Sequence, residues 1–141
     1  MRTRRAKPRR RKAVLIVDDV DDNRRLYAMF LEFDGFEVTT AADGPEALAK
    51  ARARRRPDVV VMDFAIPKID GWEVTRILKR DARTRTIPVI ALTGHALAGA
   101  EARAREAGCD AFLTKPCLPD RLADEIRRVL NVGSRRRKRA S

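Results

Sequence analysis

The sequence predicts an α/β domain built on a parallel sheet with helices on both faces. Five short apolar segments alternate along the chain with five segments of helical periodicity, which is typical of a parallel sheet with crossover helices. The third segment, Val59–Met62, is a continuous apolar run between Pro57 and Pro67, as expected for a strand buried on both faces. Because crossover connections are right-handed, few ways of winding such a chain remain.

The strand predictions depend on apolar runs that end in polar residues. The first run stops at Asp18 and Asp19, and the second alternates apolar with polar side chains at a period of two. We expect strands at Ala13–Val17, Phe36–Thr40, Val59–Met62, Ile87–Leu92 and Ala111–Leu113.

The helix predictions depend on apolar spacings of three and four residues and on terminal signals. Asp43 with Glu46, and Asp70 with Glu73, have the spacing of a capping box at a helix start. Glycines follow the first and fourth helices, as is common at a helix end. We expect a first helix carrying Leu26, Met29, Phe30 and Phe33, helices after Asp43 and Asp70, and helices at Ala96–Ala107 and Pro119–Leu130.

The charge is concentrated at the two ends of the chain. Of 32 basic residues, eight lie in residues 1–12 and five in residues 135–139, and neither segment contains an acid. The remaining chain carries 19 basic and 20 acidic residues. We therefore expect one near-neutral domain at residues 13–131, flanked by disordered basic arms at 1–12 and 132–141.

Two interpretations of the arms remain open. Runs of like charge are usually solvated, and arginine is the favoured base throughout this chain, so composition bias accounts for them. The alternative is a weak electrostatic contact with nucleic acid or another polyanion. No aromatic residue interrupts the arginines, so base stacking is not indicated, and sequence-specific DNA recognition is not expected without a recognition helix.

The cysteines and the apolar runs indicate a cytoplasmic protein without a membrane segment. Cys117 lies eight positions after Cys109, which in extended chain spans roughly 26 Å, far beyond the ~7 Å limit between the Cα atoms of a disulfide. Both residues are therefore expected to be free thiols, as in a reducing compartment. No apolar run approaches the ~18 residues that span a bilayer.

Polar residues follow four of the predicted strands, and a parallel sheet brings all four to one edge. They are Asp18 and Asp19, then Asp63, Thr93 and Lys115. Carboxylates about 4 Å apart repel by roughly 4 kcal/mol at an effective dielectric of 20, and one lysine does not neutralise three of them. A divalent cation together with the lysine would neutralise the three carboxylates. Because all the available ligand atoms are oxygens, Mg²⁺ is the favoured ion.

The motifs V-L-I-V-D-D, V-V-V-M-D-F-A-I-P-K-I-D-G, A-L-T-G and F-L-T-K-P give this chain a recognisable family signature. Together they resemble the receiver domain of two-component response regulators, over about Ala13 to Asn131. The resemblance implies a flavodoxin-like doubly wound sheet of order 2-1-3-4-5. It also implies transfer of a phosphoryl group from the phosphohistidine of a sensor histidine kinase or phosphotransfer protein.

The resemblance implies a role for each acidic residue at the predicted edge. Asp63 would be the phosphoacceptor and would form an acyl phosphate. Asp18, Asp19 and Asp63 would bind Mg²⁺, together with the backbone carbonyl of Ala65.

The resemblance also implies a switch. Lys115 would pair with the phosphoryl oxygens, and Thr93 would donate its hydroxyl to one of them. Phe112 stands at the position where the family usually has an aromatic residue that turns inward when Thr93 is drawn toward the phosphate. Thr93 and Phe112 would then form a two-state element that is biased by a local charge.

Three residues depart from the common pattern of the family or tune its chemistry. Cys117 stands where a large apolar residue is usual. Ala65 and His95 lie two residues past Asp63 and Thr93, at positions resembling those that govern the access of water to the phosphoryl group. We therefore expect His95 to change the phosphoryl lifetime.

We expect a stand-alone, phosphorylation-switched receiver, and not an enzyme beyond self-phosphorylation and autodephosphorylation. It would signal to a downstream protein through the face formed by helix 4, strand 5 and helix 5. The alternative is a polyanion-binding module that acts through its basic arms on a degenerate receiver body. A phosphohydrolase is disfavoured because such enzymes typically carry a second acid at the position of Ala65.

Overall fold

The computed structural model describes residues 10–94 and 99–140, and for residues 132–140 it describes the backbone only. Five parallel strands form one sheet in the order β2-β1-β3-β4-β5, which confirms the predicted fold class and strand order. The strands are β1 (Ala13–Val17), β2 (Glu37–Ala41), β3 (Val59–Met62), β4 (Val89–Thr93) and β5 (Ala111–Thr114).

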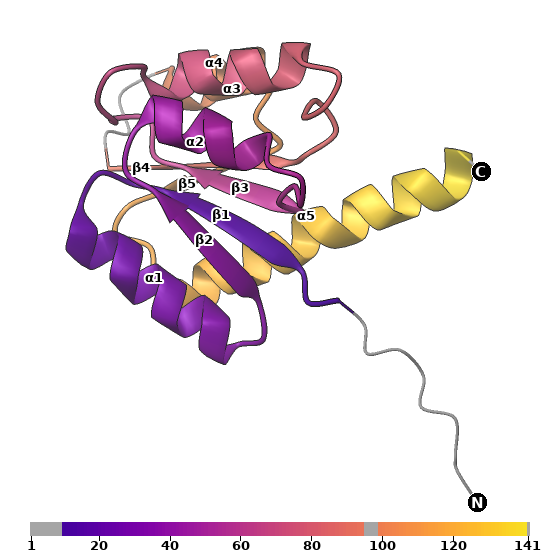
Figure 1. Ribbon diagram of the computed structural model, residues 1–141, viewed down its shortest axis with the longest axis horizontal. Coiled ribbons are helices and arrows are strands. Elements are labelled where there is room, and N and C mark those ends of the chain that lie inside the picture. The colour runs from indigo at the N-terminus through magenta and orange to yellow at the C-terminus, as the bar shows by residue number, and fades with distance from the viewer. Residues whose placement is uncertain (1–9, 95–98, 141) are drawn as a thin grey trace, which may run out of the picture.

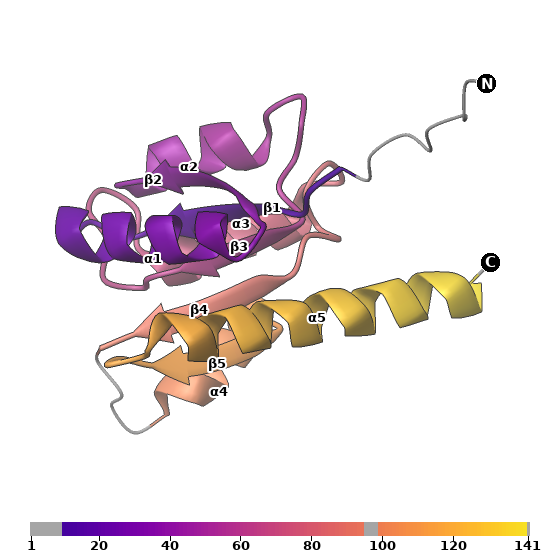
Figure 2. The same ribbon diagram turned by 90° about the horizontal axis from the view of Figure 1, so that it is seen from below.

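Helices cover both faces of this sheet (Figures 1 and 2). Helices α1 and α5 lie together on one face, and α2, α3 and α4 lie on the other. The helices are α1 (Asp21–Phe33), α2 (Gly44–Ala51), α3 (Gly71–Arg80), α4 (Ala100–Ala107) and α5 (Pro119–Ala140).

Alternation of side chains along β1 divides the core between the two faces. Leu15 and Val17 pack into the cluster under α2, α3 and α4, whereas Val14 and Ile16 pack into the cluster under α1 and α5. All four side chains are buried. A strand buried on both faces needs apolar residues at every position, which explains the continuous runs in β1, β3 and β4.

Several element boundaries differ from the sequence predictions. β4 begins at Val89 and not at Ile87, because the amide of Ile87 donates to the carbonyl of Thr84 in a turn instead of joining the sheet. α4 begins at Ala100, and Ala96 to Ala98 of the predicted helix lie outside the described residues.

The last helix is longer than predicted. α5 runs from Pro119 to Ala140, beyond the expected end near Leu130, and projects past the body of the domain (Figure 1). Arginine and lysine have good helix propensity, and extending an existing helix is easier than starting one. The backbone of 132–140 is therefore helical where we expected disorder, while the domain boundary at 131 stays a prediction.

The apolar residues of α1 do not all face the core. Tyr27 and Leu31 are buried, but Leu26, Met29 and Phe33 are 56%, 71% and 92% exposed. The spacing thus predicted the helix correctly, but of the four apolar residues that defined it, only Phe30 packs against the core. Exposed large apolar side chains on one helix mark a surface suited to contact with another protein.

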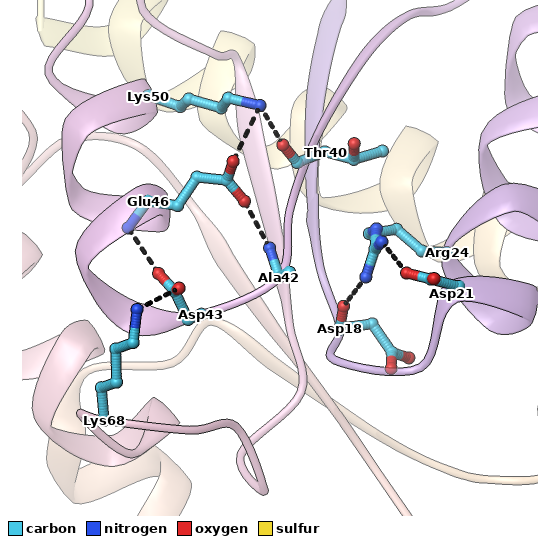
Figure 3. A network of polar contacts seen from close by, with 9 residues as sticks. All are labelled: Asp18, Asp21, Arg24, Thr40, Ala42, Asp43, Glu46, Lys50 and Lys68. Carbon is cyan, nitrogen blue, oxygen red and sulfur yellow. Dashed lines mark hydrogen bonds and ion pairs between the residues drawn. The ribbon is translucent and has the colours of Figure 1, made fainter.

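Both predicted N-caps form, and Figure 3 shows the one at Asp43. The carboxylate of Asp43 accepts from the amide of Glu46 at 2.8 Å, and that of Asp70 accepts from the amide of Glu73 at 2.9 Å. The Glu46 carboxylate reaches back to the amide of Ala42 at 2.6 Å, one residue before the cap. These bonds satisfy amides at the helix starts and hold the loops that precede α2 and α3.

Cys109 and Cys117 are free thiols, as predicted. Cys109 is buried, and burial raises the pKa of its thiol to about 12. In the part of the chain that the structure describes, we find no helix with both the length and the apolar character required to cross a bilayer.

Gly71 packs directly against the end of β3. A Cβ atom there would lie 2.4 Å from the ring of Phe64 and 2.7 Å from the carbonyl oxygen of Asp63. Since both contacts are far below van der Waals distance, we expect Gly71→Ala to lower the free energy of unfolding by about 1–3 kcal/mol, measured by urea denaturation.

Gly94→Ala is the matched control for this prediction. A Cβ on Gly94 would lie 3.8 Å from Lys115 Cβ, an ordinary contact. We expect it to change the unfolding free energy by no more than about 0.5 kcal/mol. Similar losses in the two variants would contradict the packing explanation.

Candidate functional site

Three carboxylates meet at the carboxyl edge of the sheet. Val17 and Met62 are register partners in the adjacent strands β1 and β3, so Asp18 and Asp63 directly follow paired positions. With Asp19 they offer oxygen atoms that all lie within 4.8 Å of one another. Asp18 and Asp63 are only 2% and 6% exposed, whereas Asp19 is exposed. The structure thus brings these three carboxylates together at the edge where the sequence analysis expected them.

Lys115 reaches this cluster from the loop after β5. Its Nζ lies 2.7 Å from Asp18 Oδ2 and 3.1 Å from Asp63 Oδ2. Burial acts to lower the pKa of Lys115, but the hydrogen bond to Asp18 and the charge of Asp63 outweigh it, and the net shift is upward. The ammonium group therefore stays charged at neutral pH and offsets part of the carboxylate charge.

Backbone amides orient the two buried carboxylates. Asp18 Oδ1 accepts from the amide of Val20 at 2.9 Å, and Asp63 Oδ1 accepts from the amide of Ala65 at 3.0 Å. Each carboxylate thus uses one oxygen for a local backbone bond and turns the other toward Lys115. Such fixed geometry is what a site needs before its ligand arrives.

Arg24 supports the site in a way that the sequence analysis missed (Figure 3). Its guanidinium donates to the carbonyl oxygen of Asp18 at 2.7 Å and also pairs with the carboxylate of Asp21. A side chain one turn into α1 thereby holds the loop that carries Asp18. The three-residue spacing of Asp21 and Arg24 on a helix was the available signal.

Thr93 and Phe112 lie on neighbouring strands beside the cluster. Thr93 is the last residue of β4 and is 1% exposed, and its carbonyl accepts from the amide of Lys115 at 2.8 Å. Phe112 is half-buried and packs against the core under α2, α3 and α4. It also lines a pocket of about 620 Å³ between α4, β5 and the start of α5, together with Leu118 and Arg121.

The two positions expected to control water access are only partly described. Ala65 is exposed, so no bulky side chain of its own covers the approach to Asp63. His95 lies outside the described residues.

The donor set suits a magnesium ion. Three carboxylates converge, and the ligand atoms on offer are hard oxygens, as Mg²⁺ prefers. One lysine does not balance three carboxylates, so the cluster retains net negative charge. The exposure of Asp19 leaves one side of the cluster open to water, which Mg²⁺ usually keeps among its ligands.

Comparisons with known proteins agree on one family. Residues 14–127 match the model of the response regulator receiver domain. The polar-differentiation response regulator DivK of Brucella anthropi is 41% identical over 119 residues, covering 84% of this chain and 96% of the relative.

Solved structures show the same architecture. A CheY-like receiver domain protein of Methanospirillum hungatei superposes with a TM-score of 0.83 at 28% identity, covering 90% of this chain and 99% of that one. The receiver domain of the sensor histidine kinase PA1611 of Pseudomonas aeruginosa superposes with a TM-score of 0.79 at 32% identity, covering 86% and 99%. Its structure is described with a magnesium ion coordinated in the active site cleft. With this fold and this edge of the sheet, the chain belongs to the response regulator receiver domain family.

Proposed function

We propose that the protein is a stand-alone receiver that accepts a phosphoryl group on Asp63 and thereby changes its protein contacts. The observation that carries the proposal is the position of Asp63. It is a buried carboxylate at the end of the central strand, 3.1 Å from the ammonium of Lys115 and beside two further carboxylates. Burying acidic groups together is costly, and a cation-dependent reaction at this edge is the function that explains the cost.

The proposed reaction is an in-line phosphoryl transfer. Asp63 Oδ1 is held by the amide of Ala65, so Oδ2 is the oxygen that attacks the phosphorus of a phosphohistidine. The new P–O bond forms as the P–N bond breaks, and the histidine nitrogen leaves with the electron pair. Lys115 pairs with the phosphoryl oxygens, because its ammonium already lies beside Oδ2.

Asp18, Asp19, Asp63 and the backbone carbonyl of Ala65 would hold Mg²⁺. When bound, the ion offsets the negative charge that gathers as a phosphate approaches three carboxylates. The amide of Val20 and the guanidinium of Arg24 keep the loop of Asp18 in place for this role.

Thr93 and Phe112 are proposed as the switch. A phosphoryl group on Asp63 draws the Thr93 hydroxyl toward it, and Phe112 moves into the space that Thr93 leaves. Phe112 lines the pocket between α4, β5 and α5, so its movement reshapes that surface. A downstream protein would recognise this face.

The phosphodonor would contact the exposed apolar face of α1. Val20, Leu26 and Met29 are exposed there, and Leu118 is 71% exposed in the loop before α5. The hydroxyl of Tyr27 donates to the carbonyl of Cys117 at 2.7 Å and ties α1 to that loop. Val20 follows β1 and Leu118 follows β5, so both lie beyond the carboxyl ends of parallel strands, as Asp63 does.

Asp63→Asn is expected to abolish phosphorylation by a small phosphodonor such as acetyl phosphate with Mg²⁺. The amide cannot form an acyl phosphate, and the measurement is the mass increase of the intact protein. Asp58→Asn is the matched control, because Asp58 lies before the amino end of β3 and accepts from the amide of Ala13. Phosphate uptake by the Asp63→Asn variant at the rate of the control would refute the proposed acceptor.

Leu26→Asp is expected to slow transfer from a phosphorylated histidine phosphotransfer protein by about tenfold or more, since a charge is buried at the contact. Its self-phosphorylation by acetyl phosphate should be unchanged. Ala82→Asp, an exposed change in the loop after α3, is the control and should slow neither reaction. Equal slowing with both donors would place the defect in the site and not in docking.

His95 is proposed to act on the lifetime of the phosphoryl group. We expect the phosphorylated His95→Ala variant to lose its label at a different rate from the unsubstituted protein, measured after removal of the phosphodonor. Identical decay curves would remove this role.

A further inference from the structure

A second pocket lies at the opposite edge of the sheet from Asp63. Its volume is about 650 Å³, and its walls come from the segments before β3, β4 and β5 and from the middle of α5. Its apolar floor includes Ile87 and Val129. Five basic and two acidic side chains line it: Arg56, Lys79, Arg83, Arg85, Arg128, Asp58 and Asp110.

Both acidic side chains of this pocket are already engaged by donors of the protein itself. Asp58 Oδ2 accepts from the amide of Ala13 at 2.7 Å. Asp110 Oδ2 accepts from the amide of Val89 at 2.9 Å and from Lys79 Nζ at 3.0 Å. Among the described residues, neither carboxylate therefore forms an ion pair with an arginine of the pocket.

Two of the arginines are available to a ligand. Arg83 pairs with Asp81, and its hydrogen bonds hold the pKa of that carboxyl below its usual range. Arg56 and Arg85 are exposed, and their guanidinium groups have no ion-pair partner among the residues that the structure describes. They are therefore the strongest candidates to bind an anion.

The two basic arms join the body at this same edge. The N-terminal arm, residues 1–12, leads directly into Ala13. The amide of Ala13 donates to the carboxylate of Asp58 in the pocket. The second continues α5 beyond Leu130, which also lines the pocket. Figures 1 and 2 show that β1 begins and α5 ends at one end of the molecule. In the sequence, the segments that adjoin the pocket at these two points are rich in basic residues, with eight in residues 1–12 and five in residues 135–139.

We propose that this basic edge binds the phosphate backbone of duplex nucleic acid, with Arg56 and Arg85 as contacts on the folded body. Basic side chains line the pocket, and the sequence that adjoins it on both sides is also basic, which fits an extended anion better than a small one. The pocket lining holds no aromatic residue, so it offers no platform for a base. Recognition is therefore of phosphates, without regard to sequence.

This site is independent of the proposed phosphoacceptor. It lies at the amino edge of the sheet, whereas Asp63 follows the carboxyl end of β3. The Asp63→Asn variant should therefore bind nucleic acid as the unsubstituted chain does, which separates a failure of this proposal from a failure of the proposed function.

The test is fluorescence anisotropy of a labelled DNA duplex of about 20 base pairs, titrated with the full chain at several salt concentrations. The Arg56→Gln/Arg85→Gln variant should bind about tenfold or more weakly near 100 mM salt. Its slope of log affinity against log salt should fall by about 2, one for each lost phosphate contact.

The matched control is Arg25→Gln/Arg121→Gln. It removes the same charge from exposed positions at the starts of α1 and α5, near the other edge of the sheet. The proposal predicts that this control variant binds the DNA duplex nearly as tightly as the unsubstituted chain does. Equal weakening in both variants, unchanged affinity in the pocket variant, or binding to anionic phospholipid vesicles without binding to DNA would each overturn it.

Discussion

The ion pairs of Lys115 are the interaction on which the site depends. One ammonium group reaches Asp18 at 2.7 Å and Asp63 at 3.1 Å, and so joins the ends of β5, β1 and β3. Both carboxylates are nearly inaccessible to water, so their repulsion is weakly screened, and loss of the lysine would leave them buried without a cation. The geometry of the edge is stable only because opposite charges from three strands meet there.

The two edges of the sheet differ in their balance of charge. Acidic residues follow the strands at the carboxyl edge, while five basic side chains line the pocket at the amino edge. The residues of the central strands β3 and β4 between the two edges are buried, and all but Thr93 are apolar, so the two edges do not neutralise one another by direct contact. A chain of net charge +12 can therefore carry a cation site and a cationic surface on one small body.

The part of the fold nearest the proposed switch is also lightly packed. α4 buries only small side chains, namely Ala100, Ala104 and Ala107. Its larger contact is Arg103, whose guanidinium lies 4.4 Å from the ring centre of Trp72. The ring of Trp72 in turn packs, tilted by 41°, against that of Phe64, which follows Asp63, with the ring centres 4.1 Å apart. A helix held by little apolar area can shift at low cost, which suits a surface that must change.

The sequence by itself determined the class of fold, the start of most elements and the residues of the carboxyl edge. It did so because continuous apolar runs, capping aspartates and polar residues after strands are local signals. Tertiary structure decided which face of α1 is buried, since Tyr27 and Leu31 pack on the sheet while Leu26 and Met29 do not. It also decided the contact of Arg24 with Asp18 and the gathering of arginines in the second pocket. These three features depend on contacts between segments that are far apart in the sequence. The spacing of residues within one segment does not encode such contacts.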